Sequence, residues 1–78
     1  TIVEMRNRAE EMRISEVDKT LKNMDHLSSS DKDAIQQLTQ SLVNKILHKP
    51  TINLKKKTQS QDGHIYLKAI RHLFHLDD

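Results

Sequence analysis

The chain contains one glycine and one proline in 78 residues. A β-sheet protein of this length needs many turns, and turns depend on glycine and proline. Charged residues make up 31% of the chain and aromatic residues only 3%, so aliphatic side chains must build the core. Together these features predict an all-α fold made of a few long helices.

A chain of this size has difficulty in burying enough apolar surface by itself. A small domain buries only about 60% of the surface that its unfolded chain exposes, and disulfides, metals or partner chains usually supplement it. The sequence has no cysteine, which excludes disulfides and thiolate zinc sites. Burial against a partner chain is therefore the expected supplement. The lack of cysteine also favours a cytoplasmic protein.

No part of the sequence indicates a membrane protein or a secreted one. No apolar run approaches the about 18 residues of a membrane span, and no signal-peptide pattern is present. The first residues already have helical character and no initiator methionine precedes them. We therefore expect a fragment of a longer protein.

The first helix is expected from Ile2 to about Met24. Its apolar residues form two sets with the 3, 4, 3 spacing of an amphipathic helix. At about 100° per residue, the second set is rotated by roughly 120° from the first. We expect the C-terminal set to pack inside the domain and the N-terminal set to meet another chain or another domain, unless the chain's own bundle wraps the whole helix. The sets are Ile2, Met5, Ala9 and Met12, then Ile14, Val17, Leu21 and Met24.

The second helix is expected from Asp31 to His48. Ser29 or Ser30 is the predicted cap, because a serine hydroxyl accepts from free N–H groups of the first turn. Leu42 lies at the centre of a wide apolar face and is expected to be buried, whereas Lys56, further along the chain, is expected to be solvated. The face comprises Ile35, Leu38, Leu42, Val43, Ile46 and Leu47.

Pro50 predicts a kink, or a restart at Thr51, because proline lacks a backbone donor and disfavours helical geometry before it. A short helix would then run to about Thr58. A third helix is expected from about Gly63 to His75, with Asp62 as its cap. The predicted architecture is an antiparallel helical hairpin with a shorter C-terminal helix, completed into a helical bundle in a homodimer.

The candidate functional residues are those expected in a dimer interface or in the core. Their side chains are apolar. Those on the first two helices fall on the faces described above, and the two on the third helix fall on opposite apolar sides of that helix. They are Ile2, Met5, Ala9, Met12, Leu38, Leu42, Ile46, Leu73 and Phe74. No catalytic, cofactor-binding or metal site is predicted, because the chain has no glycine-rich phosphate loop and no serine with a histidine–carboxylate pair.

Two alternatives give the polar residues a function. A run of lysines from Lys55 to Lys57, with Lys45 and Lys49, could attract an RNA backbone, although the aromatic residues that stack on bases are scarce. His72 and His75 have a spacing that suits metal or haem binding on a helix. Solvated helix faces are the simpler interpretation of both sets.

Three blocks resemble the C-terminal dimerisation domain of glutamyl-tRNA reductases, over nearly the whole chain. The blocks are RNRAEEMRISEVDKTL at residues 6–21, LTQSLVNKILHKPTINLK at residues 38–55 and DGHIYLKAIRHLFHL at residues 62–76. The middle block is the most specific in order and spacing. It carries Asn44, Lys45, Leu47, His48, Pro50, Leu54 and Lys55.

The resemblance implies that residues 1–78 form a single helical dimerisation domain of a larger enzyme, with the remainder of the reductase N-terminal to it. That family reduces glutamate on its tRNA to glutamate-1-semialdehyde with NADPH, at the start of tetrapyrrole (porphyrin and haem) synthesis. The family's cysteine nucleophile and NADPH site lie in other domains. This chain is therefore expected to form a homodimer, to bind no cofactor and to be inactive alone, with at most a minor tRNA contact through Lys55, Lys56 and Lys57.

We predict that the isolated chain neither binds NADPH nor reduces glutamyl-tRNA, because it lacks the cysteine nucleophile and the phosphate-binding glycines. Titration of NADPH followed by its fluorescence measures the first property. A dissociation constant in the micromolar range would contradict the prediction.

Overall fold

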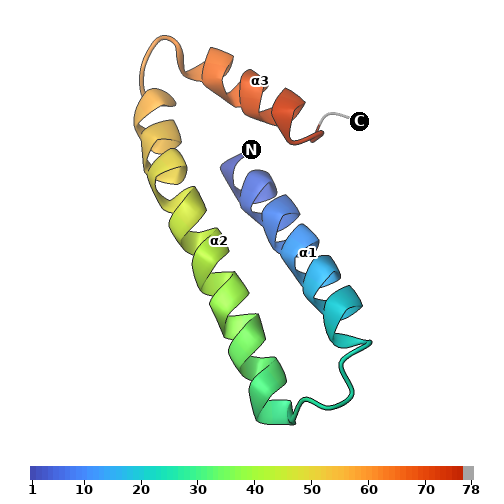
Figure 1. Ribbon diagram of the computed structural model, residues 1–78. Coiled ribbons are helices and arrows are strands. Elements are labelled where there is room, and N and C mark those ends of the chain that lie inside the picture. The colour runs from blue at the N-terminus through green and yellow to red at the C-terminus, as the bar shows by residue number, and fades with distance from the viewer. Residues whose placement is uncertain (77–78) are drawn as a thin grey trace.

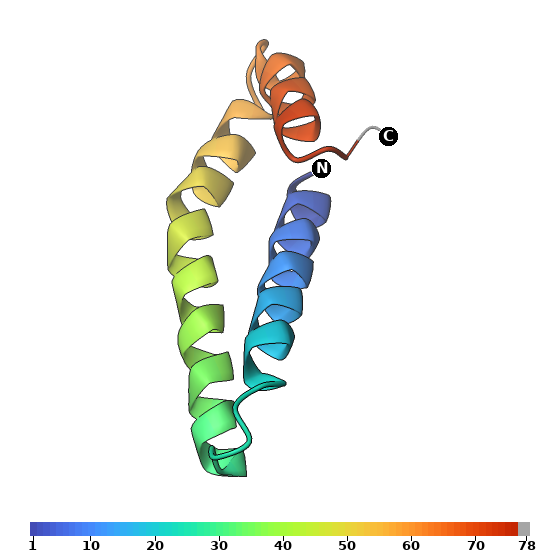
Figure 2. The ribbon, with the colours of Figure 1, turned by 45° about the vertical axis from the view of Figure 1, so that its right-hand side comes forward.

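Three helices make up the computed structural model, which describes residues 1–76 (Figure 1). They are α1 (Ile2–Leu21), α2 (Ser29–Lys57) and α3 (Gly63–Leu73). α1 and α2 form an antiparallel hairpin, and the shorter α3 crosses the end of the hairpin at which the chain begins (Figures 1 and 2). The described residues contain no strand, so the all-α prediction and the predicted order of the helices are confirmed.

The molecule is a thin layer. Its principal dimensions are 53 × 25 × 12 Å, so the three helices lie close to one plane. Two packed layers normally enclose a domain core. Among the described residues, the buried hydrophobic side chains are correspondingly few: Met5, Val17, Leu21, Leu47 and Leu54.

One row of residues on α1, spaced by four along the sequence, faces α2. The row comprises Met5, Ala9, Arg13, Val17 and Leu21, and it combines members of both predicted sets. The expectation that the N-terminal set meets another chain is wrong for Met5, which is 1% exposed within this chain. The helix ends at Leu21 rather than Met24, because the next residues close a turn: the N–H of Met24 donates to the carbonyl of Leu21 at 3.1 Å.

α2 begins with a reciprocal cap. The Oγ of Ser28 accepts from the N–H of Asp31 at 3.1 Å, and the Oδ2 of Asp31 accepts from the N–H of Ser28 at 3.2 Å. The prediction of Ser29 or Ser30 as the cap is therefore wrong. Ser28 is the serine that stands three residues before a side chain able to complete a capping box.

α2 continues through Pro50 to Lys57, so the predicted restart at Thr51 is wrong. The proline is exposed. Thr51 and Leu54, which follow it, are buried at 9% and 6% exposure. This packing holds the helix together across the missing hydrogen bond.

The apolar face expected on α2 divides into two. Leu47 is buried and Ile35 and Val43 are half-buried, whereas Leu42 is 50% exposed. The expectation that Leu42 is buried is therefore wrong within the single chain, because α1 covers only a narrow strip of α2. Lys56 is exposed, as predicted.

α3 ends at Leu73 and not at His75. His75 has a positive φ of 55°, and the N–H of Leu76 donates to the carbonyl of Arg71 at 2.8 Å. This is a Schellman motif, in which a left-handed residue stops the helix. Asp62 occupies the N-cap position as predicted, but its side chain accepts no capping hydrogen bond.

Gly63 permits the sharp corner between α2 and α3. A Cβ at this position would lie 2.7 Å from the carbonyl oxygen of Lys57 and 2.7 Å from the Cα of Thr58. Both are backbone atoms, so relief requires the corner to move. The corner also carries a cation–π contact, with the Nζ of Lys57 5.5 Å from the ring centroid of Tyr66.

We predict that Gly63→Ala destabilises the fold by about 1–3 kcal/mol, as overpacking against fixed atoms does. Urea unfolding at one fixed protein concentration measures this cost. The matched control is His64→Ala at the adjacent exposed position, which is expected to change stability by less than about 0.5 kcal/mol. Equal midpoints for the two variants would contradict the close approach.

Candidate dimer interface

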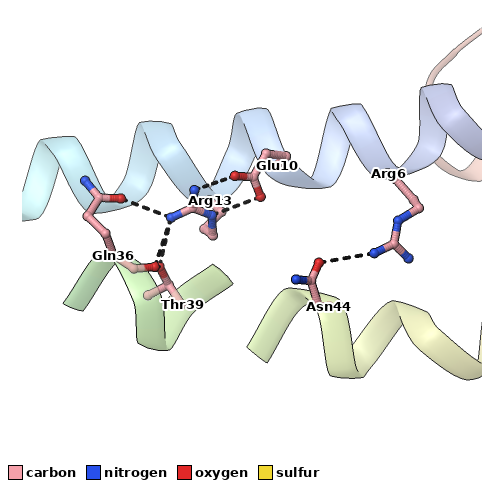
Figure 3. A network of polar contacts seen from close by, with 6 residues as sticks. All are labelled: Arg6, Glu10, Arg13, Gln36, Thr39 and Asn44. Atoms are coloured by element: carbon pink, nitrogen blue, oxygen red, sulfur yellow. Dashed lines mark hydrogen bonds and ion pairs between the residues drawn. The ribbon is translucent and has the colours of Figure 1, made fainter. Parts of the chain in front are cut away.

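A nearly buried arginine joins the two helices of the hairpin (Figure 3). The side chain of Arg13 is 8% exposed. Its Nη1 donates to the Oε1 of Gln36 at 3.0 Å and to the Oγ1 of Thr39 at 3.1 Å, both on α2. On its own helix it forms an ion pair with Glu10. These charge-assisted hydrogen bonds fix how α1 and α2 are paired along their lengths.

Arg6 makes a second bridge nearer the N-terminus of α1. Its guanidinium donates to the Oγ1 of Thr51 at 2.9 Å and to the Oδ1 of Asn44 at 3.1 Å (Figure 3 shows the second bond). Neither arginine was among the residues selected from the sequence. Arg13 had a recognisable signal, because it is the one charged residue in the row between Met5 and Leu21.

The ion pairs lower the pKa of the two carboxyls that take part in them. A hydrogen bond from Arg13 lowers the pKa of Glu10, and one from Arg71 lowers that of Glu4. The same contact with Glu10 raises the pKa of Arg13. Both carboxylates are therefore charged at neutral pH. Glu4 connects α1 to α3, whereas Glu10 holds the side chain of Arg13 on its own helix.

A row of exposed apolar side chains runs along α2. We call Leu38, Leu42 and Ile46 the α2 stripe, because they are spaced by four residues on one side of the helix. Their exposed fractions are 59%, 50% and 68%. Single exposed apolar residues are common on protein surfaces and need no explanation. Three large aliphatic side chains in one exposed row form a contiguous patch, and such a patch indicates an interface.

Exposed apolar residues also occur on the other two helices. Met12 on α1 is 61% exposed, and Leu73 on α3 is 69% exposed. Of the remaining predicted interface or core residues, Met5 is buried and Ile2, Ala9 and Phe74 are half-buried. The predicted set thus divides between core and surface. Contact of the exposed members, Met12, Leu38, Leu42, Ile46 and Leu73, with another chain stays a prediction.

The lysine run has a structural explanation. Lys55, Lys56 and Lys57 are exposed in the last turn of α2, where positive charge is favoured by the helix dipole. Lys57 also lies against Tyr66. Of the other lysines in the RNA alternative, Lys45 and Lys49 border a shallow hollow in which every lining residue is exposed. This is an open surface and not an enclosed binding site.

His72 and His75 do not share a helical face as their spacing predicts. His72 lies in α3, whereas His75 lies beyond its end in a left-handed conformation. The carbonyl oxygen of His75 accepts from Arg8 at 3.0 Å, which gives this residue a place in the contact between α3 and α1. Residues 1–76 contain no group of three or more side chains that could hold a metal ion.

None of the described helices is both long enough and apolar enough to cross a membrane.

The chain is similar to known proteins over its whole described length. Residues 1–76 match the family described as glutamyl-tRNAGlu reductase, dimerisation domain.

The individual relatives are named glutamyl-tRNA reductase. The chain is 42% identical over 76 residues to the glutamyl-tRNA reductase of Syntrophotalea carbinolica, covering 97% of this chain and 17% of the relative. It is 40% identical over 78 residues to that of Syntrophobacter fumaroxidans, covering 100% of this chain and 17% of the relative. It is 35% identical over 77 residues to that of Heliobacterium mobile, covering 99% of this chain and 17% of the relative. The chain therefore spans about a sixth of the length of these relatives, and no solved structure matches it.

The ion pair between Glu10 and Arg13 predicts a stability that depends on pH. Because the folded pKa of Glu10 is below its ordinary value of 4.5, the pair stabilises the fold fully above that pH and is lost as pH falls through the folded pKa. The difference in urea midpoint between the parent chain and Glu10→Gln should therefore shrink below pH 4.5.

Glu11→Gln is the matched control, since the neighbouring Glu11 is exposed and forms no ion pair within the described part of the chain. Its effect should show little dependence on pH over the same range. A Glu10→Gln difference that stays constant from neutral to acid pH would contradict a stabilising role of the ion pair.

Proposed function

This chain belongs to the dimerisation-domain family of glutamyl-tRNA reductases, and we propose from this that it joins two copies of a longer reductase chain into a homodimer. The observation that carries the proposal is the thin layer with an exposed apolar row. One layer cannot enclose a core. A second copy supplies the second layer without any further sequence.

The α2 stripe is the part of the surface that gains most from such a contact. Its three side chains are at least half exposed in the single chain, and burial stabilises by about 25 cal/mol per Å² of apolar area. A stable interface needs about 20–30 residues on each side. The stripe is therefore the centre of the proposed interface, with its neighbours on α1 and α3 completing it.

The activity of the longer protein is a further part of the proposal. The relatives are named glutamyl-tRNA reductases, which supports NADPH-dependent reduction of glutamyl-tRNA in tetrapyrrole synthesis in the cytoplasm. The sequence has no cysteine to act as a nucleophile and a single glycine. The catalytic centre and the NADPH site are accordingly assigned to parts of the protein outside this chain.

The RNA-binding alternative receives no support from the comparisons. The family is described by dimerisation, and the lysines that suggested RNA binding lie where a helix end favours positive charge. We therefore assign no tRNA contact to this chain.

We predict that the chain has a mass in solution of twice its 9.1 kDa, measured by light scattering at micromolar concentration. Leu42→Asp should shift the mass toward the monomer, because it places an unpaired charge at the centre of the interface. Gln37→Asp adds the same charge at an exposed polar position outside the α2 stripe and should leave the dimer intact. A parent chain that stays monomeric at high micromolar concentration would contradict the proposed function.

A further inference from the structure

A thin layer has two broad faces, and the second copy can pack on one or on the other. On α1 the two faces are distinguished by the neighbours of Arg13, whose side chain is directed at α2 (Figure 3). Successive residues of a helix are about 100° apart. Met12 and Ile14 therefore lie on opposite broad faces. Both are exposed, at 61% and 42%.

The α2 stripe obeys the same rule. Each of its members directly precedes a residue directed at α1: Leu38 precedes Thr39, which Arg13 contacts, and Ile46 precedes the buried Leu47. Viewed from its own N-terminus, every right-handed helix turns in the same sense. Because α1 and α2 are antiparallel and face each other, the residues that precede inward-facing ones lie on the same broad face in both helices. Met12 and the α2 stripe therefore share one face, which we call face A.

The opposite face of the hairpin, face B, is polar on α2. The residues that follow the inward-facing positions Thr39, Val43 and Leu47 are exposed and hydrophilic. They are Gln40, Asn44 and His48. The shallow hollow described above begins at these residues and extends around α2 as far as Ile46. Ile14 and Ile52 are the large apolar residues that this rule assigns to face B. They lie far apart along the hairpin and form no row.

The apolar residues of face A on the two helices lie side by side at the start of the α2 stripe. The hydrogen bonds of Arg13 to Gln36 and Thr39 place Met12 beside the start of the α2 stripe. The apolar patch therefore extends across both helices.

α3 bounds face A at its other end. Glu4, Arg8 and Met12 are spaced by four on α1. Arg71 of α3 contacts Glu4 at 2.7 Å, and Arg8 contacts the His75 carbonyl oxygen. The C-terminal end of α3 thus covers the beginning of this row and leaves Met12 open.

We propose that the second copy packs on face A, with Met12 and the α2 stripe at the centre of the contact, and that face B stays outside it. This rests on the proposed function, because the occupant is a second copy of this chain. A patch that extends over two helices and meets its own copy buries matched apolar area on both sides. Face B would bury the polar groups of Gln40 and His48, and also the amide nitrogen of Asn44, whose Oδ1 already accepts from Arg6. This burial costs free energy unless each group finds a partner.

The test compares Met12→Asp with Ile14→Asp. The two variants place the same charge on the same helix, two residues apart, on opposite faces. Met12→Asp is expected to raise the dimer dissociation constant at least about tenfold, since a buried unpaired charge costs that much or more. Ile14→Asp is expected to change it by less than about threefold. Analytical ultracentrifugation measures both, with helix content followed by circular dichroism.

If the parent chain is a dimer, three results would overturn the assignment to face A and leave the proposed dimer standing. They are a larger loss of dimer affinity in Ile14→Asp than in Met12→Asp, equal losses in both variants, and no loss in either. A monomeric parent chain would overturn the proposed function itself. If either aspartate variant fails to fold, Met12→Cys and Ile14→Cys replace the pair, because the chain has no other cysteine. The thiol at Met12 should then react with an alkylating reagent more slowly as the protein concentration rises, and the thiol at Ile14 should not. Protection of the Ile14 thiol alone would overturn the assignment.

Discussion

The guanidinium of Arg13 determines how the hairpin is assembled. It is nearly buried, it is paired with Glu10, and it donates to a side-chain amide and a hydroxyl on α2. A buried arginine needs all of these partners, because an unpaired charge away from water is strongly unfavourable. The pairing of α1 with α2 is therefore held in one register. That register decides which residues of each helix face inward and which remain at the surface.

The thinness of the layer leaves much of the domain's apolar surface uncovered within the single chain. Five hydrophobic side chains are buried within the described part of the chain, while ten large apolar residues remain exposed. In a chain of this size the favourable burial barely exceeds the loss of conformational entropy. Stability and dimerisation are thus coupled, and what weakens the proposed contact also weakens the fold.

This arrangement fits a domain whose function is to position other domains. Its polar side chains are used for caps, ion pairs and bridges between helices. Ser28 and Asp31 cap α2, and Arg71 connects α3 to Glu4. A rigid pairing of two copies transmits a fixed geometry to whatever is attached to them. The relatives named glutamyl-tRNA reductase are several times longer than this chain.

The sequence by itself determined the fold class, the order of the helices and the family, because helical periodicity, the scarcity of glycine and proline, and the middle block are local properties of the chain. It could not decide whether α2 breaks at Pro50, since the burial of Leu54 and of Thr51, which accepts a hydrogen bond from Arg6 of α1, outweighs the local effect of proline. It also could not separate core from surface in the predicted interface residues. Met5 is buried and Leu42 is half exposed because the pairing through Arg13 rotates each helix to one orientation, and that contact joins residues far apart in the sequence.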